Sequence, residues 1–368
     1  MNKKYKIYIF HPYSSIGGAD LSISRLIKKL DIRKYDVDFI CLNKSVIGKY
    51  LNDNRTKIVK IKSSRALLAV NKIRDHVKKD KNKNYKKYIF ISNQNFANVI
   101  SFLILFNINW VKQVLIERNH IDEFKFVQKN LIKNFFIKFM MKILYKKSDA
   151  VIGISKILSN DLSKYINKKV ITIYNPSFDK SIVKQSKAKI FFKKNKKIIL
   201  NVARLEKQKD QITLLKAFSI VLKSIDCQLI IIGFGSEEKK IKQFIREKKL
   251  SKKVLILTKV QNPFPYFKIA DLFVLTSKYE GFGNVLIEAA IFNKPIISSN
   301  CNSGPIEILK NGKGGDLFNV GDYQKLSKKI IFNMKKKKMN KVLYMKERIK
   351  EFHIDHITNK YKKLFKEI

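Results

Sequence analysis

Residues 272–291 have the sequence LFVLTSKYEGFGNVLIEAAI, which combines three kinds of local structure. The first six residues form a nearly continuous apolar run, which is typical of a strand buried on both faces of a sheet. Two glycines in the middle favour a loop, and we expect Asn284 to cap a helix that begins at Val285. A buried strand, a tight loop and a helix form the repeating unit of a parallel α/β sheet.

The same unit recurs along the chain in two series. Strands are expected at residues 6–10, 36–42, 57–61, 88–92, 112–117, 150–155 and 170–174, and then at 197–203, 228–233, 253–258, 272–277 and 294–299. A charged, irregular stretch at residues 179–196 separates the two series. The pattern predicts an α/β protein with two doubly wound, Rossmann-like domains facing across a cleft, which is the expected ligand site.

The chain of 368 residues is strongly basic, with a formal net charge of +49. Three interpretations of this charge remain open: the base composition of an AT-rich genome, binding to an anionic membrane, and binding to nucleic acid. The sequence has no zinc-finger spacing, arginine-rich tail or RNP-like aromatic motif, so no specific nucleic acid is expected as a partner.

Cysteine usage and apolar runs bear on the compartment. Cys41, Cys227 and Cys301 lie far apart in the sequence, which favours a reducing, cytoplasmic location. The apolar run near the N-terminus is too short for a signal peptide and predicts a first strand. Residues 88–111 carry no charge, but asparagines and a glutamine interrupt them, so we expect a strand and a core helix instead of a membrane span.

Residues 131–147 mix five lysines with phenylalanine, methionine and leucine. A basic amphipathic helix of this kind binds anionic lipid, whereas a core helix with solvated lysines has a similar composition. The sequence leaves both interpretations open.

The strongest candidate site follows the strand quoted first. Glu280 lies in the loop before the helix and Glu288 about two turns later, so both carboxylates can surround one elongated polar ligand. A single glutamate of this kind is often only a helix-dipole partner, but the pair with its glycines predicts a binding site. The residues expected to line the ligand between the two carboxylates are Gly281, Phe282, Gly283, Asn284 and Val285.

Two further loops follow strands of the second series. Arg204 and Lys209 lie between a strand and the next helix, where they can neutralise a diphosphate or simply be surface cations. Gly233 begins the turn GFGS, which lacks the third glycine of a dinucleotide fingerprint, so NAD binding is not predicted. This turn is either structural or a ligand contact.

In the first series, Gly17 and Gly18 open a helix whose amides can bind an anion, although an ordinary turn explains them as well. Asp36 and Asp38 match the D-x-D pattern of metal-dependent sugar transferases, but their place at the start of a strand favours a structural role. No His or Cys cluster in the sequence has metal-site spacing, so no metal is expected.

These segments, in this order, resemble glycosyltransferase family 4, whose members are retaining enzymes of the GT-B fold. The resemblance is carried by Gly17-Gly18, Glu117 to His120, Ser148 to Ser155, Asn175-Pro176, Arg204 to Lys209 and Glu280 to Glu288, and it ends near Gly315. Two positions, Ala203 and Asp210, depart from the family pattern, which commonly has glycine there. The charged residues of the pattern are all present.

The resemblance implies a role for each charged candidate. Glu280 would bind hydroxyls of the transferred sugar, and Glu288 would bind the ribose of the nucleotide. Arg204 and Lys209 would hold the diphosphate and stabilise its charge as it leaves, without a metal.

The resemblance also implies roles for the first domain and the domain boundaries. Gly17 and Gly18 would contact the donor phosphates or admit the acceptor, and His120 would touch the donor sugar. We expect an acceptor-binding domain at residues 1–180, a nucleotide-sugar-binding domain at 181–346, and a C-terminal helix at 347–368 that crosses back to the first domain.

The resulting prediction is a retaining transferase that moves a hexose or N-acetylhexosamine from a nucleotide diphosphate-sugar to a lipid-linked or polysaccharide acceptor of surface-glycan synthesis, such as capsule or lipopolysaccharide. A UDP-sugar is the favoured donor and GDP-mannose the second choice. We expect no metal, no tightly bound cofactor, an undecaprenyl-linked acceptor, and a peripheral location on the inner face of the cytoplasmic membrane. The alternatives are a nucleic-acid-binding basic protein and a nucleotide-sugar epimerase of the same fold.

Overall fold

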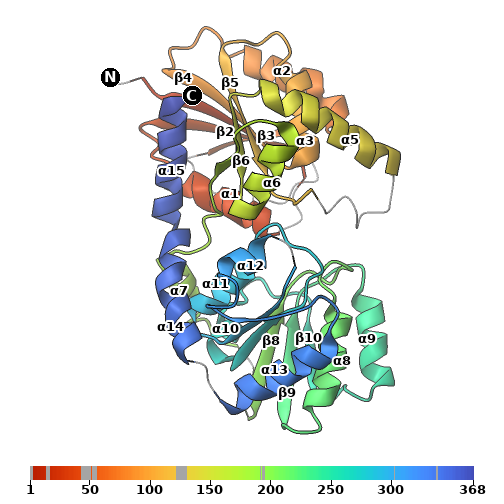
Figure 1. Ribbon diagram of the computed structural model, residues 1–368. Coiled ribbons are helices and arrows are strands. Elements are labelled where there is room, and N and C mark those ends of the chain that lie inside the picture. The colour runs from red at the N-terminus through yellow and green to blue at the C-terminus, as the bar shows by residue number, and fades with distance from the viewer. Residues whose placement is uncertain are drawn as a thin grey trace. The chain divides into compact units, whose positions relative to one another are not determined.

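The computed structural model describes residues 3–13, 17–42, 51, 56–121, 131–190, 192, 195–301, 303–336 and 339–368. The chain divides into two compact units, Met1–Pro176 with Ile354–Ile368, and Ser177–His353. Each unit is built on one parallel sheet (Figure 1).

The first unit contains a seven-stranded sheet in the order β3-β2-β1-β4-β5-β6-β7. Its strands are β1 (Tyr5–Phe10), β2 (Tyr35–Leu42), β3 (Thr56–Ile61), β4 (Lys87–Asn93), β5 (Val111–Glu117), β6 (Ala150–Gly153) and β7 (Ile171–Thr172). Its helices are α1 (Gly18–Lys29), η2 (Leu67–Ala69), α2 (Val70–Lys78), α3 (Asn95–Ile104), α5 (Leu131–Leu144), η3 (Tyr145–Lys147), α6 (Lys156–Ile166) and α15 (Ile354–Glu367). β1 is buried along its whole length, because helices cover both faces of the sheet.

The second unit contains a six-stranded sheet in the order β10-β9-β8-β11-β12-β13. Its strands are β8 (Lys197–Val202), β9 (Cys227–Ile232), β10 (Val254–Leu257), β11 (Leu272–Leu275), β12 (Ile296–Ser299) and β13 (Asp316–Phe318). Its helices are α7 (Lys180–Gln185), α8 (Gln211–Val221), α9 (Glu238–Glu247), α10 (Phe264–Ile269), α11 (Asn284–Ile291), α12 (Gly304–Ile308), α13 (Tyr323–Lys335), α14 (Met339–Arg348) and η4 (Ile349–Phe352).

The predicted fold class of two Rossmann-like α/β domains is confirmed. Each expected strand is present, although residues 170–174 contribute only Ile171–Thr172 to the sheet. β13 was not predicted, because three residues are too few for a recognisable apolar run. Among the described residues, no helix is both long and apolar enough to cross a bilayer.

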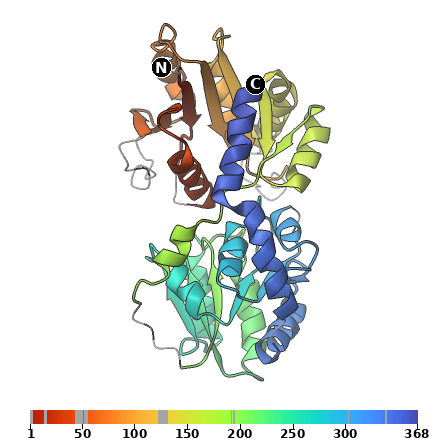
Figure 2. The ribbon, with the colours of Figure 1, turned by 90° about the vertical axis from the view of Figure 1, so that its left-hand side faces the viewer.

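The last helix, α15, belongs to the first unit. It lies beside α1, where Lys29 Nζ and Asp355 Oδ1 are 2.9 Å apart. The ring of Phe365 meets Tyr35 edge-on, with 6.2 Å between the centroids. Figure 2 shows α15 passing in front of this unit's strands. The C-terminal residues therefore complete one face of the first sheet.

A buried charge cluster occupies the amino-terminal edge of the first sheet. Lys6 Nζ lies 3.0 Å from Asp36 Oδ2 and 2.8 Å from Asp38 Oδ1, and His76 Nε2 lies 2.6 Å from Asp38 Oδ2. Burial opposes ionisation of Asp38, but hydrogen bonds from His76 and Lys6 outweigh it and lower the pKa of this carboxyl. The carboxylates of the D-x-D pattern are thus held in ion pairs, at the edge opposite the carboxyl ends of the strands.

The variant Lys6→Met should lower the free energy of unfolding by about 3 kcal/mol, because it removes the lysine partner of a buried carboxylate. Urea denaturation at neutral pH measures this change. Lys57→Met, at an exposed position on β3, is the matched control and should change little. Equal small effects of both variants would contradict a stabilising role for the cluster.

Candidate functional site

Three loops meet at the carboxyl edge of the second sheet. β8 lies between β9 and β11, and both pairings are parallel. Since parallel neighbours end at the same edge, the loops that follow them come together there. The loop after β8 holds Arg204 and Lys209, the loop after β9 begins with Gly233, and the loop after β11 holds Glu280.

Lys209 and Glu280 form an ion pair across two of these loops. Lys209 Nζ lies 2.5 Å from Glu280 Oε1, and the two side chains are only 13% and 9% exposed. Ser277 Oγ donates a second hydrogen bond to Glu280 Oε1 at 2.7 Å, and Thr276 Oγ1 donates to the Lys209 carbonyl at 2.9 Å. A shielded pair with these additional hydrogen bonds holds both charges in defined positions.

Gln208 links the same two loops. Its Nε2 donates to the Tyr279 carbonyl at 2.8 Å, and its own carbonyl accepts from the Lys278 amide at 2.7 Å. The exposed Arg204 donates from Nη2 to Gln208 Oε1 at 3.3 Å. The loop after β8 therefore offers one shielded cation, on Lys209, and one solvent-facing guanidinium, on Arg204.

Gly233 brings the loop after β9 against the loop after β8. Its φ is +155°, and a Cβ at this position would lie 1.9 Å from the carbonyl oxygen of Ala203. The Leu205 amide donates to the Phe234 carbonyl at 2.9 Å, which joins the two loops directly. Because only glycine permits this approach of two backbones, Gly233 has a structural function whether or not it contacts a ligand.

The loop after β11 runs into α11. Asn284 is the first helical residue, and its N-cap is Gly283 with a φ of +99°. The expected capping role of Asn284 is therefore wrong, because glycine adopts this positive φ at little cost and takes the cap position. Asn284 Oδ1 instead accepts a hydrogen bond from Ser177 Oγ at 2.9 Å. Glu288 lies in the second turn of α11 and is buried.

The segment from Gly281 to Val285 spans this loop and the first turn of α11, and the start of α12 supports it. Glu280 and Ser303 form an isolated parallel bridge, and Ser303 Oγ donates to the Gly281 carbonyl at 3.0 Å. A Cβ on Gly304 would lie 1.8 Å from the carbonyl oxygen of Phe282. These contacts fix the backbone that carries Glu280.

In the first unit, Gly17 is the N-cap of α1 and Gly18 is its first residue. Asp20 Oδ2 accepts a hydrogen bond from the Gly17 amide at 2.7 Å, and Asp20 Oδ1 lies 2.6 Å from His11 Nε2. Burial opposes ionisation of Asp20, but these hydrogen bonds and the charge of Arg118 outweigh it and lower the pKa of the carboxyl. An ionised Asp20 thus anchors the start of α1.

A chain of buried side chains extends from Asp20 across the carboxyl ends of β1, β4 and β5. Arg118 Nε donates to Asn93 Oδ1 at 2.5 Å, so the Asn93 amide nitrogen faces His11 Nδ1, 2.8 Å away. His11 therefore accepts on Nδ1 and donates from Nε2 to Asp20. Arg118 Nη1 also donates to Asn175 Oδ1 at 2.7 Å, and burial lowers the pKa of its guanidinium.

Two neighbours of Arg118 complete this part of the first unit. His120 Nε2 lies 2.8 Å from Asp161 Oδ2, and the ring is buried. Glu117 accepts hydrogen bonds from the Arg118 amide at 3.0 Å and from Tyr145 Oη at 3.0 Å. Complete burial outweighs these hydrogen bonds and raises the pKa of Glu117 to about 7.

The candidate residues thus fall into two groups. Gly17, Gly18 and His120 lie in the first unit, whereas the remaining candidates lie in the second. The chain that starts from His11 and Asn93 was not predicted, although polar residues at the ends of apolar strands are a usable signal. In the described part of the chain, no group of three or more His, Cys, Asp or Glu side chains is arranged to hold a metal ion.

Comparison with known proteins identifies the type of domain. Residues 183–351 match the family model described as "Glycosyl transferases group 1". The chain carries a group 1 glycosyl transferase domain. The resemblance inferred from the sequence is confirmed, and the matched residues include Arg204, Lys209, Glu280 and Glu288.

Two curated relatives come from Campylobacter jejuni. The chain is 31% identical over 195 residues to N-acetylgalactosamine-N,N'-diacetylbacillosaminyl-diphospho-undecaprenol 4-alpha-N-acetylgalactosaminyltransferase, an alignment that covers 52% of each chain. It is 26% identical over 370 residues to an undecaprenol-linked-glycan alpha-1,4-N-acetyl-D-galactosaminyltransferase, covering 96% of each. Alignments with three curated relatives span only 28%, 52% and 61% of their lengths.

Solved structures share the fold over the whole chain. The Anabaena protein Alr3699/HepE, solved in complex with UDP and glucose, has a TM-score of 0.80 with 17% sequence identity, covering 100% of both chains. Similarity at this level of identity shows a common GT-B architecture.

Gly304→Ala should lower the free energy of unfolding by about 3 kcal/mol, because the added Cβ overlaps the Phe282 backbone. Gly321→Ala is the matched control, since its φ is +82° but no atom lies within 4 Å of a Cβ there. Strain alone should cost the control about 1 kcal/mol. Thermal and urea unfolding of both variants test the difference, and equal losses would contradict the close approach.

Glu117→Gln should change the pH dependence of stability. The pKa of Glu117 rises from 4.5 to about 7 on folding, so the folded wild type binds the proton more tightly than the unfolded chain. The wild type should therefore lose stability relative to the variant as pH rises from about 4.5 to about 7. Urea denaturation of both proteins at several pH values measures this. A pH-independent difference would contradict a raised pKa.

Proposed function

We propose that the protein is a retaining glycosyltransferase that transfers a hexose or N-acetylhexosamine from a nucleotide diphosphate-sugar to a glycan acceptor of surface-polysaccharide synthesis. The observation that carries this proposal is the Lys209–Glu280 pair, 2.5 Å apart where β8 and β11 end. The Lys209 ammonium is a group that binds phosphate, and the Glu280 carboxylate is a group that binds sugar hydroxyls. Both lie within the domain that matches the glycosyl transferase family.

The charges of this site suit the chemistry of the leaving group. In the transfer, the bond between the anomeric carbon and the β-phosphate oxygen breaks, and the electron pair stays on the diphosphate. Lys209 and the exposed Arg204 supply positive charge for this oxygen, which supports transfer without a metal. Glu280 binds hydroxyls of the sugar, and Glu288 binds the ribose.

Retention follows if the acceptor oxygen attacks from the face that the diphosphate leaves, and the acceptor hydroxyl gives its proton to a leaving-group oxygen. The rigid Lys209–Glu280 arrangement supports this step by holding the diphosphate and the sugar in one orientation. Gly17 and Gly18 contact the donor phosphates or admit the acceptor, and His120 touches the donor sugar.

A UDP-sugar is the favoured donor, and GDP-mannose is the second choice. The Anabaena protein of the same fold was solved in complex with UDP and glucose, which supports this preference. We assign acceptor binding to residues 1–180 and donor binding to residues 181–346. Within the expected segment 347–368, the helix that belongs to the first unit is α15 (Ile354–Glu367), which follows the end of α14 and η4.

The acceptor in this proposal is lipid-linked. The names of both Campylobacter relatives contain undecaprenol, which supports an undecaprenyl-linked acceptor for this chain. The protein then works as a peripheral enzyme on the inner face of the cytoplasmic membrane.

Lys209→Met should lower kcat at least about 100-fold, because it removes the shielded cation that stabilises the leaving diphosphate. Lys207→Met is the matched control, since Lys207 is exposed in the same loop, and it should keep near-normal turnover. Release of UDP from a panel of UDP-sugars, with GDP-mannose alongside, provides the assay.

Two results would contradict the proposal. Equal turnover of the Lys209 and Lys207 variants would remove Lys209 from the site. Conversion of the donor sugar to an epimer, without any acceptor, would instead indicate a nucleotide-sugar epimerase.

A further inference from the structure

Helix α5 has two apolar faces, and only one of them is covered. Ile137 and Met141 are buried, and Tyr145, one turn further on, continues this stripe. Six other large apolar side chains of the helix are between 42% and 87% exposed: Leu131, Ile132, Phe135, Phe136, Phe139 and Ile143.

The exposed side chains share one face of the helix. At about 100° per residue, the six positions fall within about 140° of arc, opposite the buried stripe. Such a wide apolar face is more than a surface helix of a globular protein needs for packing. The spacing of the six apolar residues along the sequence therefore gives α5 an apolar face that is exposed to solvent.

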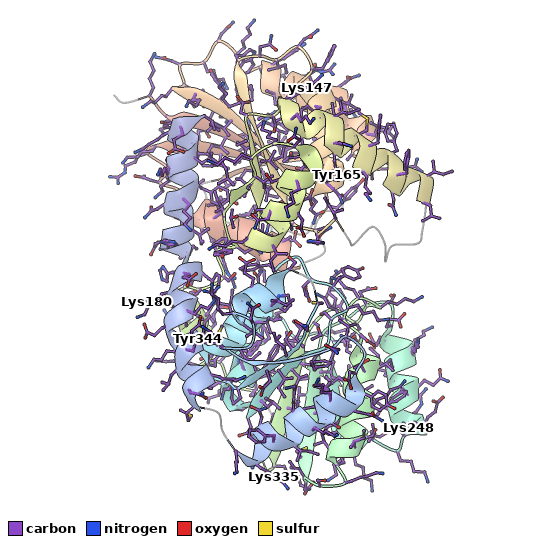
Figure 3. All side chains as sticks on the ribbon, in the orientation of Figure 1. Lys147, Tyr165, Lys180, Lys248, Lys335 and Tyr344 are labelled. Carbon is purple, nitrogen blue, oxygen red and sulfur yellow. The ribbon has the colours of Figure 1, made fainter. Side chains whose placement is uncertain are left out.

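Lysines lie beside and within this face. Lys133 Nζ lies 4.8 Å from the ring centroid of Phe96, and Lys138 Nζ lies 5.9 Å from that of Tyr165 on α6. Figure 3 marks Tyr165 on α6 and Lys147 just beyond the C-terminal end of α5. Lys133 and Lys138 lie beside the exposed apolar residues, and the exposed Lys142 falls among them at the helical period, so this face of α5 combines apolar and basic side chains.

Two more apolar side chains are exposed near the C-terminal end of α3, the helix that contacts α5. Leu103 lies in the last turn of α3 and Phe106 two residues beyond it, and they are 47% and 64% exposed. Residues 131–147 contain five lysines and neither Asp nor Glu. We call these eight exposed apolar residues, with the lysines of residues 131–147, the α5 surface. An exposed apolar face like that of α5 marks an interaction site.

We propose that the α5 surface docks the protein on an anionic lipid bilayer. The exposed apolar side chains enter the boundary between headgroups and acyl chains, and the lysines bind lipid phosphates. Charge decides between a bilayer and a second copy of this chain, since two α5 surfaces would bring like charges together. This docking rests on the proposed function, since the α5 surface would bring the enzyme to an acceptor that is anchored in the membrane.

Flotation with vesicles tests the proposal without donor or acceptor. Phe135→Gln with Phe139→Gln should weaken binding to vesicles of phosphatidylglycerol and phosphatidylcholine at least about tenfold. Leu67→Gln with Leu68→Gln is the matched control, since both leucines are exposed in the same unit, and it should bind like the wild type. Wild-type binding by the phenylalanine variant would overturn the proposal.

A second pair of variants separates local charge from the net charge of the chain. Lys142→Glu with Lys146→Glu should weaken vesicle binding more than Lys78→Glu with Lys79→Glu, which makes the same change in net charge at exposed positions on and beside α2. Equal losses would mean nonspecific attraction and would overturn the proposal. A lipid-free dimer that the phenylalanine variant abolishes would overturn it in favour of a second copy.

The two proposals can fail separately. If only the docking proposal fails, the phenylalanine variant binds vesicles like the wild type, while the Lys209 variant still loses turnover on a water-soluble acceptor. If only the transferase proposal fails, the α5 variants lose vesicle binding while the Lys209 and Lys207 variants behave alike.

Discussion

The ion pair between Lys209 and Glu280 is the constraint on which the site depends. The two residues are 71 positions apart, and they meet only because β8 and β11 are parallel neighbours whose loops leave the same edge. Hydrogen bonds from Ser277 and through Gln208 hold the pair in place. Burying the Lys209–Glu280 pair costs desolvation energy that offsets the attraction of the two charges. The loops around the pair therefore have to supply the stability of this part of the fold. Close backbone contacts at Gly233 and Gly304 supply that rigidity.

The two edges of the first sheet use charge differently. At the amino edge, Lys6 pairs with Asp36 and Asp38, and His76 pairs with Asp38, in a cluster that serves stability. At the carboxyl edge, Asp20 pairs directly with His11, and the Asn93 amide joins His11 to Arg118, so that this chain fixes the start of α1. The same residue types therefore stabilise the fold at one end of the strands and position a loop at the other. A D-x-D pattern alone suggests a metal site, but its place at the start of a strand indicates a structural role here.

Local patterns predicted the fold and much of the second-unit site. Continuous apolar runs identify strands covered on both faces, and glycines with charged residues after β8 and β11 identify the loops. The remainder depends on contacts distant in the sequence. The bond from Ser177 to Asn284 spans 107 positions, so the sequence could not show that Asn284 has another partner. Likewise, the sequence of α5 contains both faces of the helix, and only the neighbouring α3 and α6 decide which of them is covered.

The central claim is that Lys209 and Glu280 bind one sugar nucleotide between them. A crystal structure of the protein soaked with a UDP-sugar tests it most directly. The account predicts diphosphate oxygens within hydrogen-bond distance of Lys209 Nζ and Arg204, and sugar hydroxyls on Glu280. Nucleotide density away from the carboxyl ends of β8 and β11, with the ion pair untouched, would contradict it.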